Sequence, residues 1–246
     1  MINITIWNES THKDNNKKAY PDGMSTAIKG TFDGKEEYSV TCALLDDPGQ
    51  GLPDELLEKT DVLLWWGHAR HDDVSDDLAD KVCKRVEEGM GLITLHSGHY
   101  SKPFRKLMGT SCSLTWREKK GEAERVWTTN PYHPIAQGVQ QGFRLDGEEM
   151  YGEFFDIPEP DDVIFTGWFS GGEVFRSGCT FTRGQGRIFY FQPGHESFPI
   201  YYNPNIRQII ENAVLWVSKN DSGEISFKAS PDCPCRGDTL EPIYSC

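Results

Sequence analysis

The chain has 246 residues, a length that one α/β domain with a single sizeable core accounts for. Its formal net charge is −13, and its basic residues form no cluster beyond short pairs such as Lys119-Lys120, which argues against a nucleic-acid partner. No apolar run approaches the roughly 20 residues that a membrane span needs. The first residues have the pattern of a strand and lack the basic start and long apolar stretch of a signal peptide.

Seven cysteines bear on the cellular compartment. Four are scattered through apolar segments, a pattern typical of reduced, buried thiols in a cytoplasmic protein: Cys42, Cys83, Cys112 and Cys179. The other three lie in a polar tail, where we expect a docked arm with reduced thiols rather than a metal site or a disulfide: Cys233, Cys235 and Cys246. The cysteines therefore favour a cytoplasmic location.

In the first half of the chain, hydrophobic runs alternate with helical patterns, which predicts a mostly parallel sheet with helices on both faces. The strands expected there are, in chain order, Ile2–Trp7, Tyr38–Leu44, Asp61–Trp66 and Gly91–Leu95. The helices expected between and after them are Gly23–Gly30, Pro53–Glu58, Asp76–Glu88 and Lys102–Leu107.

The middle third has shorter, alternating strands, which predicts antiparallel additions to the sheet. These strands are Ser111–Trp116, Glu124–Thr129, Phe143–Glu148, Val163–Phe169 and Glu173–Thr182. A buried strand at Arg187–Phe191 and a helix at Pro204–Val217 follow. We expect one domain over residues 1–218. The tail 219–246 has too few apolar residues for its own core, so we expect it to dock on the domain or on a neighbouring subunit of a homo-oligomer.

Five of the seven histidines directly follow predicted core strands: His68, His71, His96, His99 and His195. In an open α/β sheet, the carboxyl ends of the strands converge on the crevice where ligands bind. Glycines beside these histidines permit tight turns and close approach of a ligand. The sequence therefore predicts a histidine cluster as the reactive centre. By contrast, His133 precedes a short predicted helix and is expected to be structural.

Two chemistries suit such a cluster, and the sequence leaves both open. Zinc takes three protein ligands and a water in catalytic sites, and the ligands here would be His68, His96 and His195. Alternatively, His96 and His195 act as metal-free general acid and base with Glu149 or Glu196. The spacing His-x-x-His occurs twice, but it is a weak metal signal without the helix-borne glutamate of His-Glu-x-x-His.

Carboxylates and aromatic residues near these strand ends are further candidates. The run Glu148–Glu153 is either a solvated turn or a source of groups that orient the histidines. No cysteine stands beside a histidine at a strand end, so a thiol nucleophile is not expected. Contacts with a substrate are expected from five ring-bearing side chains: Trp66, His71, His99, Tyr100 and Tyr151.

At these residues the chain resembles the ThuA-like, trehalose-utilisation family, whose fold is similar to that of class I glutamine amidotransferases. The resemblance covers roughly residues 2–217 and implies a flavodoxin-like, three-layer sandwich with a mostly parallel sheet. It is carried by the segments Trp65–His71, Leu95–Phe104, Glu148–Glu153, Gly172–Gly178 and Gln192–Glu196.

The resemblance includes one informative departure. Amidotransferases of this superfamily place a nucleophilic cysteine after the central strand and a histidine after a late strand, at positions that resemble His96 and His195. A glutaminase without the thiol has no nucleophile, so that activity should be absent. The family resemblance implies instead a role in the metabolism of a disaccharide or other sugar, trehalose or an oxidised derivative of it. Our first hypothesis is a hydrolase- or lyase-like enzyme acting on such a carbohydrate-derived small molecule. The alternative is a non-catalytic sugar-binding or regulatory protein on the same fold.

Overall fold

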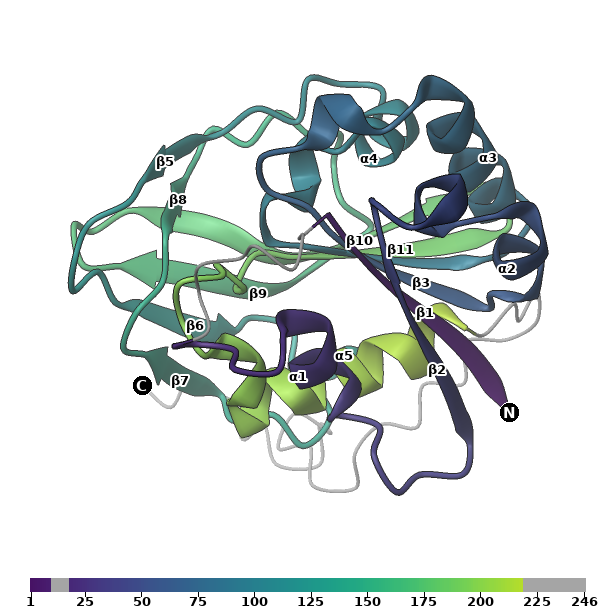
Figure 1. The fold of residues 1–246 in the computed structure, drawn as a ribbon. Helices are drawn as coiled ribbons and strands as arrows, with labels where there is room; N and C mark the ends of the chain where they lie inside the picture. The colour runs from purple at the N-terminus through teal and green to yellow at the C-terminus, as the bar shows by residue number, and fades with distance from the viewer. Residues whose placement is uncertain (10–17, 219–246) are drawn as a thin grey trace, which may run out of the picture.

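A nine-stranded mixed sheet crosses the molecule in the order β2-β1-β3-β4-β11-β10-β9-β6-β7 (Figure 1). The computed structural model describes residues 1–9 and 18–218, so the predictions for the tail and its three cysteines lie outside the described residues. Five neighbouring strands are parallel: β2 (Tyr38–Leu44), β1 (Ile2–Asn8), β3 (Val62–Trp66), β4 (Gly91–Leu95) and β11 (Gly186–Phe191). Their carboxyl ends therefore open on one edge of the sheet.

Four antiparallel strands extend this sheet beyond β11: β10 (Val174–Arg183), β9 (Asp162–Phe169), β6 (Glu124–Thr128) and β7 (Gly142–Leu145). A separate two-stranded sheet pairs β5 (Thr115–Arg117) with β8 (Met150–Gly152). The prediction of a parallel core with antiparallel additions is confirmed.

Helices cover both faces of the sheet, which makes three layers (Figure 1). One face packs against α1 (Met24–Lys29) and α5 (Pro204–Val217), and the other packs against α2 (Asp54–Lys59), α3 (Asp76–Glu87) and α4 (Lys102–Met108). Short 3₁₀ helices complete the connections: η1 (Pro48–Gly51), η2 (His71–Asp73), η3 (His96–Tyr100), η4 (Pro134–Ala136) and η5 (Ile200–Tyr202). Within the described ranges, no helix is long and apolar enough to cross a membrane.

Local sequence explains where the flanking helices begin. The Ser75 hydroxyl accepts the backbone N–H of Leu78 at 3.2 Å and caps α3, and the Asn203 amide oxygen accepts the N–H of Asn205 at 2.9 Å and caps α5. The strands β3 and β4 are buried at every position because helices lie on both of their faces.

Three sequence expectations need correction. The strand expected at Ser111–Trp116 begins only at Thr115, because the backbone N–H of Cys112 bonds to the carbonyl of Asp156 instead. The strand expected to reach Glu148 ends at Leu145, and β8, which was not predicted, begins at Met150. Cys42 was expected to be buried but is exposed, because β2 is an edge strand of the sheet.

Candidate functional site

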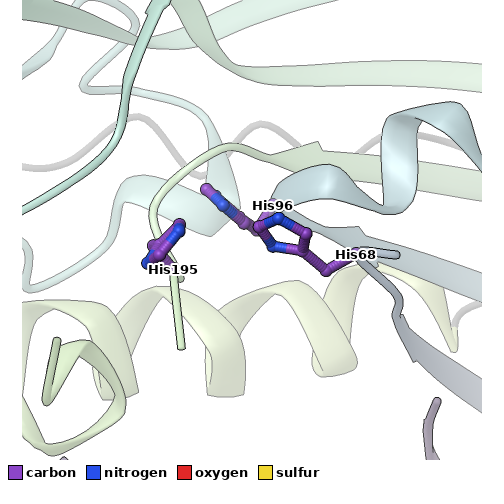
Figure 2. Close-up of side chains that lie close together, drawn as sticks. All are labelled: His68, His96 and His195. Atoms are coloured by element: carbon purple, nitrogen blue, oxygen red, sulfur yellow. The ribbon is translucent and has the colours of Figure 1, made fainter. Parts of the chain in front are cut away.

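Three imidazoles meet at the carboxyl edge of the parallel strands (Figure 2). His68 follows β3, His96 follows β4 and His195 follows β11, and these three strands are neighbours in the sheet. One ring nitrogen of each lies within 4.8 Å of those of the other two. The expected convergence of these side chains from distant parts of the chain is therefore observed.

His96 stands at the centre of the cluster and is fully buried. Its backbone has φ 49°, a left-handed conformation that is rare for a residue with a side chain and typical of tight functional turns. Its Nδ1 lies 2.9 Å from the carbonyl oxygen of Gln192, which can only accept, so Nδ1 carries a hydrogen. Its Nε2 lies 3.2 Å from Glu149 Oε2 and 3.4 Å from the Tyr151 hydroxyl. Both ring nitrogens are thus engaged by protein groups.

Glu149 is a buried carboxylate, 5% exposed, beside this imidazole. Burial alone would raise its pKa, but the hydrogen bond and the charge of His96 outweigh burial and lower the pKa overall. The Tyr151 hydroxyl bridges the pair to the Ser97 hydroxyl at 2.7 Å. The reading of the acidic run as a solvated turn is wrong at this position, because the carboxylate is enclosed and paired.

His68 and Glu196 form a second pair, nearer to solvent. His68 Nδ1 lies 3.0 Å from Glu196 Oε2, and the two side chains are 30% and 27% exposed. The separation is that of an ion pair, although the atoms are not aligned for a regular hydrogen bond. Burial lowers the pKa of His68, but Glu196 and more distant carboxylates outweigh this and raise it. Conversely, His68 outweighs burial at Glu196 and lowers the pKa of that carboxyl to about 2.

His195 differs from the other two in the use of its ring nitrogens. Its Nδ1 accepts the backbone N–H of Ser197 at 3.1 Å, so Nδ1 carries no hydrogen and Nε2 does when the ring is neutral. Burial, followed by the charge of His96, lowers its pKa to about 4. His195 is therefore neutral near pH 7. Its Nε2, which lies 3.7 Å from Glu196 Oε2, is a hydrogen-bond donor in the cluster.

Two carboxylates that the sequence did not single out for this purpose shape the loops of the site. Glu148, 1% exposed, accepts the backbone N–H groups of Glu149, Gly194 and His195 at 2.8–3.1 Å. Glu9, directly after β1, accepts the backbone N–H groups of the two residues that follow His68. Glu9 could have been predicted from the same signal as the histidines, because it is also a polar residue directly after an apolar strand.

The remaining expected site residues have other surroundings. His99 is buried behind the cluster with Nδ1 2.7 Å from the carbonyl of Cys112, and burial lowers its pKa to about 3. Trp66 is 3% exposed and donates its indole N–H to the carbonyl of Gly194, which positions that loop, and its contact with a substrate stays a prediction. His71 and Tyr100 contact each other edge to face outside the group of three, and Tyr100 is 44% exposed.

His133 lies apart from the site, as expected. It precedes η4, and its Nδ1 accepts the backbone N–H of Ile135 at 3.2 Å. Its ring packs against Trp216 with centroids 5.2 Å apart. This histidine has a structural role at a helix start and makes a useful control for substitutions in the cluster.

The layers, the strand order and the turn at His96 define an α/β protein of the flavodoxin-like, class I glutamine amidotransferase-like type. The chain belongs to the ThuA family, described as trehalose utilisation, whose sequence profile matches residues 3–217. No functionally curated protein matches the chain.

Solved structures agree on the fold. A ThuA-like protein from Bacteroides uniformis is 17% identical with a TM-score of 0.67, over 91% of this chain and 94% of that one. One from Parabacteroides merdae is 12% identical with a TM-score of 0.66, over 91% and 92%. A cytoplasmic protein from Salmonella typhimurium is 13% identical with a TM-score of 0.62, over 89% and 100%. At these identities the similarity supports the fold alone.

Proposed function

We propose that the protein is an enzyme that acts on a small carbohydrate-derived molecule, with proton transfer by the histidine cluster. The observation that carries the proposal is the meeting of His68, His96 and His195, with ring nitrogens within 4.8 Å and ionised carboxylates on two sides. Membership of the trehalose-utilisation family supports a carbohydrate substrate. The cytoplasmic Salmonella neighbour supports the cytoplasm as the place of action.

The proposed proton acceptor is His68. Its Nδ1 faces the Glu196 carboxylate at 3.0 Å, which favours a hydrogen on Nδ1 and leaves the lone pair of Nε2 for a substrate or water. A carboxylate beside the ring stabilises the imidazolium that forms when the ring takes a proton. The partial exposure of both side chains gives a substrate access to this pair.

His195 is the proposed hydrogen-bond donor to the leaving oxygen, because its acceptance of the Ser197 N–H leaves a hydrogen on Nε2 and the ring is neutral near pH 7, so this hydrogen polarises the oxygen without being transferred. Cleavage of a glycosidic bond by hydrolysis or elimination removes a proton from water or carbon and delivers one to the leaving oxygen. His68 would take up the proton and, as the imidazolium beside Glu196, pass it to the leaving oxygen that His195 polarises; the two ring centroids are 5.2 Å apart. His96 and Glu149 are paired with each other, so they would position His68 and His195 and balance the charge that forms on His68.

A divalent metal centre is the second candidate, favoured by the close approach of three imidazole nitrogens. The Nδ1 atoms of His68 and His96 face a carboxylate and a carbonyl, the arrangement that usually orients histidine ligands. His195 fits less well, because binding through Nε2 needs a hydrogen on Nδ1, where the Ser197 N–H already points. When bound, zinc would supply a Lewis acid and an activated water.

The test is turnover of a panel of disaccharides and their keto derivatives, with and without added zinc. We expect His68→Gln and Glu196→Gln to lower kcat at least about a hundredfold while the fold survives, the scale of general acid–base catalysis. His133→Asn is the matched control, since asparagine also caps a helix start, and it should keep full activity. Unchanged turnover in both cluster variants would overturn the proposal, as would ligand binding without turnover by the wild type.

A further inference from the structure

The antiparallel end of the sheet carries a second group of side chains suited to ligand binding. Arg125 of β6 lies directly opposite Arg144 of β7 on one side and Trp168 of β9 on the other. Residues directly opposite each other in an antiparallel ladder share a face, with Cβ atoms about 4.5–5.5 Å apart. Two guanidinium groups and an indole therefore form one row across the three adjacent strands β7, β6 and β9.

A cavity of about 230 Å³ lies at this row, lined by Ala123, Arg125, Arg144, Trp168, Phe169 and Ser170. One part of its wall is fixed, because the Ser170 hydroxyl accepts the backbone N–H of Ala123 at 3.2 Å and donates to the carbonyl of the same residue. Drug-sized ligands occupy pockets of about 300–1,000 Å³. The smaller volume here suits a single ring with one substituent.

The positive charges of Arg125 and Arg144 favour the binding of an anion. Like charges directly opposite in a ladder destabilise a sheet, yet two arginines face each other in a chain of net charge −13. Among the described residues, Arg144 forms an ion pair with Asp146 alone, whose side chain is 91% exposed, so water screens the pair. Within residues 1–9 and 18–218, Arg125 has no carboxylate at ion-pair distance. Paired guanidinium groups are the side chains that best match a phosphate group.

Aromatic surface stands beside the arginines. Trp168 is 46% exposed, and Val174, its cross-strand neighbour on β10, is 52% exposed. Trp127 of β6 is 42% exposed and lies opposite Gly142 of β7. The indole packs directly against this glycine, since an added Cβ there would come within 2.9 Å of the ring. A flat ring can lie on an exposed indole face, which offers a large apolar surface at little entropic cost.

We infer that this cavity binds a phosphorylated monosaccharide, with the phosphate on Arg125 and Arg144 and the sugar ring against Trp168. In the sheet order, β6 is three strands from β11, which is about 14 Å at the usual strand spacing of about 4.8 Å. The cavity is therefore separate from the histidine cluster. The inference stands independently of the proposed function.

Calorimetric titration of the full chain at low salt tests this inference with glucose 6-phosphate, inorganic phosphate and glucose. We expect glucose 6-phosphate to bind most tightly, and Arg125→Gln with Arg144→Gln to weaken it at least about tenfold, as expected for lost charge-assisted hydrogen bonds. Lys59→Gln with Lys84→Gln removes the same charge at exposed positions of α2 and α3, and this control should bind as the wild type does.

Trp168→Leu separates the two halves of the inference. It should weaken glucose 6-phosphate severalfold and leave inorganic phosphate unchanged. The inference is overturned if the wild type binds no glucose 6-phosphate at a ligand concentration of about 10 mM, because a dissociation constant above that concentration is weaker than any useful affinity. Equal weakening by the arginine and the lysine double variants would also overturn it, because the effect would then follow net charge alone.

Discussion

Glu148 holds His195 through the backbone: Glu148 Oε1 accepts the backbone N–H of His195 at 3.1 Å, and the glutamate is buried, with 1% of its surface exposed. The same carboxylate accepts the N–H groups of Gly194 and Glu149. One buried side chain thus fixes both the loop that carries His195, the proposed hydrogen-bond donor to the leaving oxygen, and the residue that pairs with His96. Burial raises the pKa of Glu148 well above its usual value, while the three backbone N–H groups act in the opposite direction.

Replacing Glu148 by Gln should destabilise the protein and disturb His195. The new amide NH₂ faces backbone N–H groups that can only donate, so at least one buried hydrogen bond is lost. We expect a loss of about 1–3 kcal/mol in the free energy of unfolding. Chemical denaturation measures this loss. Glu36→Gln, at an exposed position, is the control and should change stability by less than about 0.5 kcal/mol.

Glu124 should make stability depend on pH. It is fully buried, and desolvation raises its pKa to about 8, while a hydrogen bond from Ser177 acts against this. Because the folded pKa lies above the unfolded one, near 4.5, the stabilisation is complete below pH 4.5 and is lost as pH rises through 8. Glu124→Gln should remove this dependence.

The measurement is the free energy of unfolding of wild type and Glu124→Gln between pH 5 and pH 9. As pH rises, the free energy of unfolding of the wild type should fall relative to that of the variant by at most about 1.4 kcal/mol per pH unit. Glu36→Gln serves again as the comparison and should follow the wild-type curve. Parallel curves for wild type and Glu124→Gln would mean that the buried carboxyl does not gain a proton on folding.

Removal of Glu196 should lower the pKa of His68. The carboxylate lies 3.0 Å from His68 Nδ1 and, with more distant carboxylates, outweighs the burial that favours the neutral ring. In Glu196→Gln, burial should dominate and bring the His68 pKa below its usual value. NMR titration of the imidazole resonances follows this shift, with His133 as the internal reference. An unchanged His68 pKa would contradict the pairing on which the proposed proton acceptor depends.

Metal content separates the two candidate chemistries. We expect less than about a tenth of an equivalent of zinc in protein purified without added metal, and no effect of chelators on turnover, because His195 offers a hydrogen rather than a lone pair to the cluster. Elemental analysis and chelation measure both. One bound zinc that is lost in His68→Ala and His195→Ala would instead establish the metal centre.

Much of the fold could be predicted from the chain alone. Apolar runs such as Gly91–Leu95 carry their own boundary signals, and α5 occupies the predicted residues Pro204–Val217. The strand at Met150–Gly152 was missed because it has three residues and pairs with a segment far away in the chain, so no local period reveals it. The exposure of Cys42 followed from the position of its strand at the sheet edge, which is a property of topology.

By itself, the sequence determined that His68, His96 and His195 would approach one another, since each directly follows a buried strand and parallel strands end at a common edge. Only the tertiary structure decided what each ring does there. Donor and acceptor roles depend on which nitrogen meets a carbonyl, a carboxylate or a backbone N–H, and those partners come from other strands and loops. The burial of Glu148 beneath the cluster was decided in the same way, because a local acidic run does not reveal which backbone N–H groups surround it.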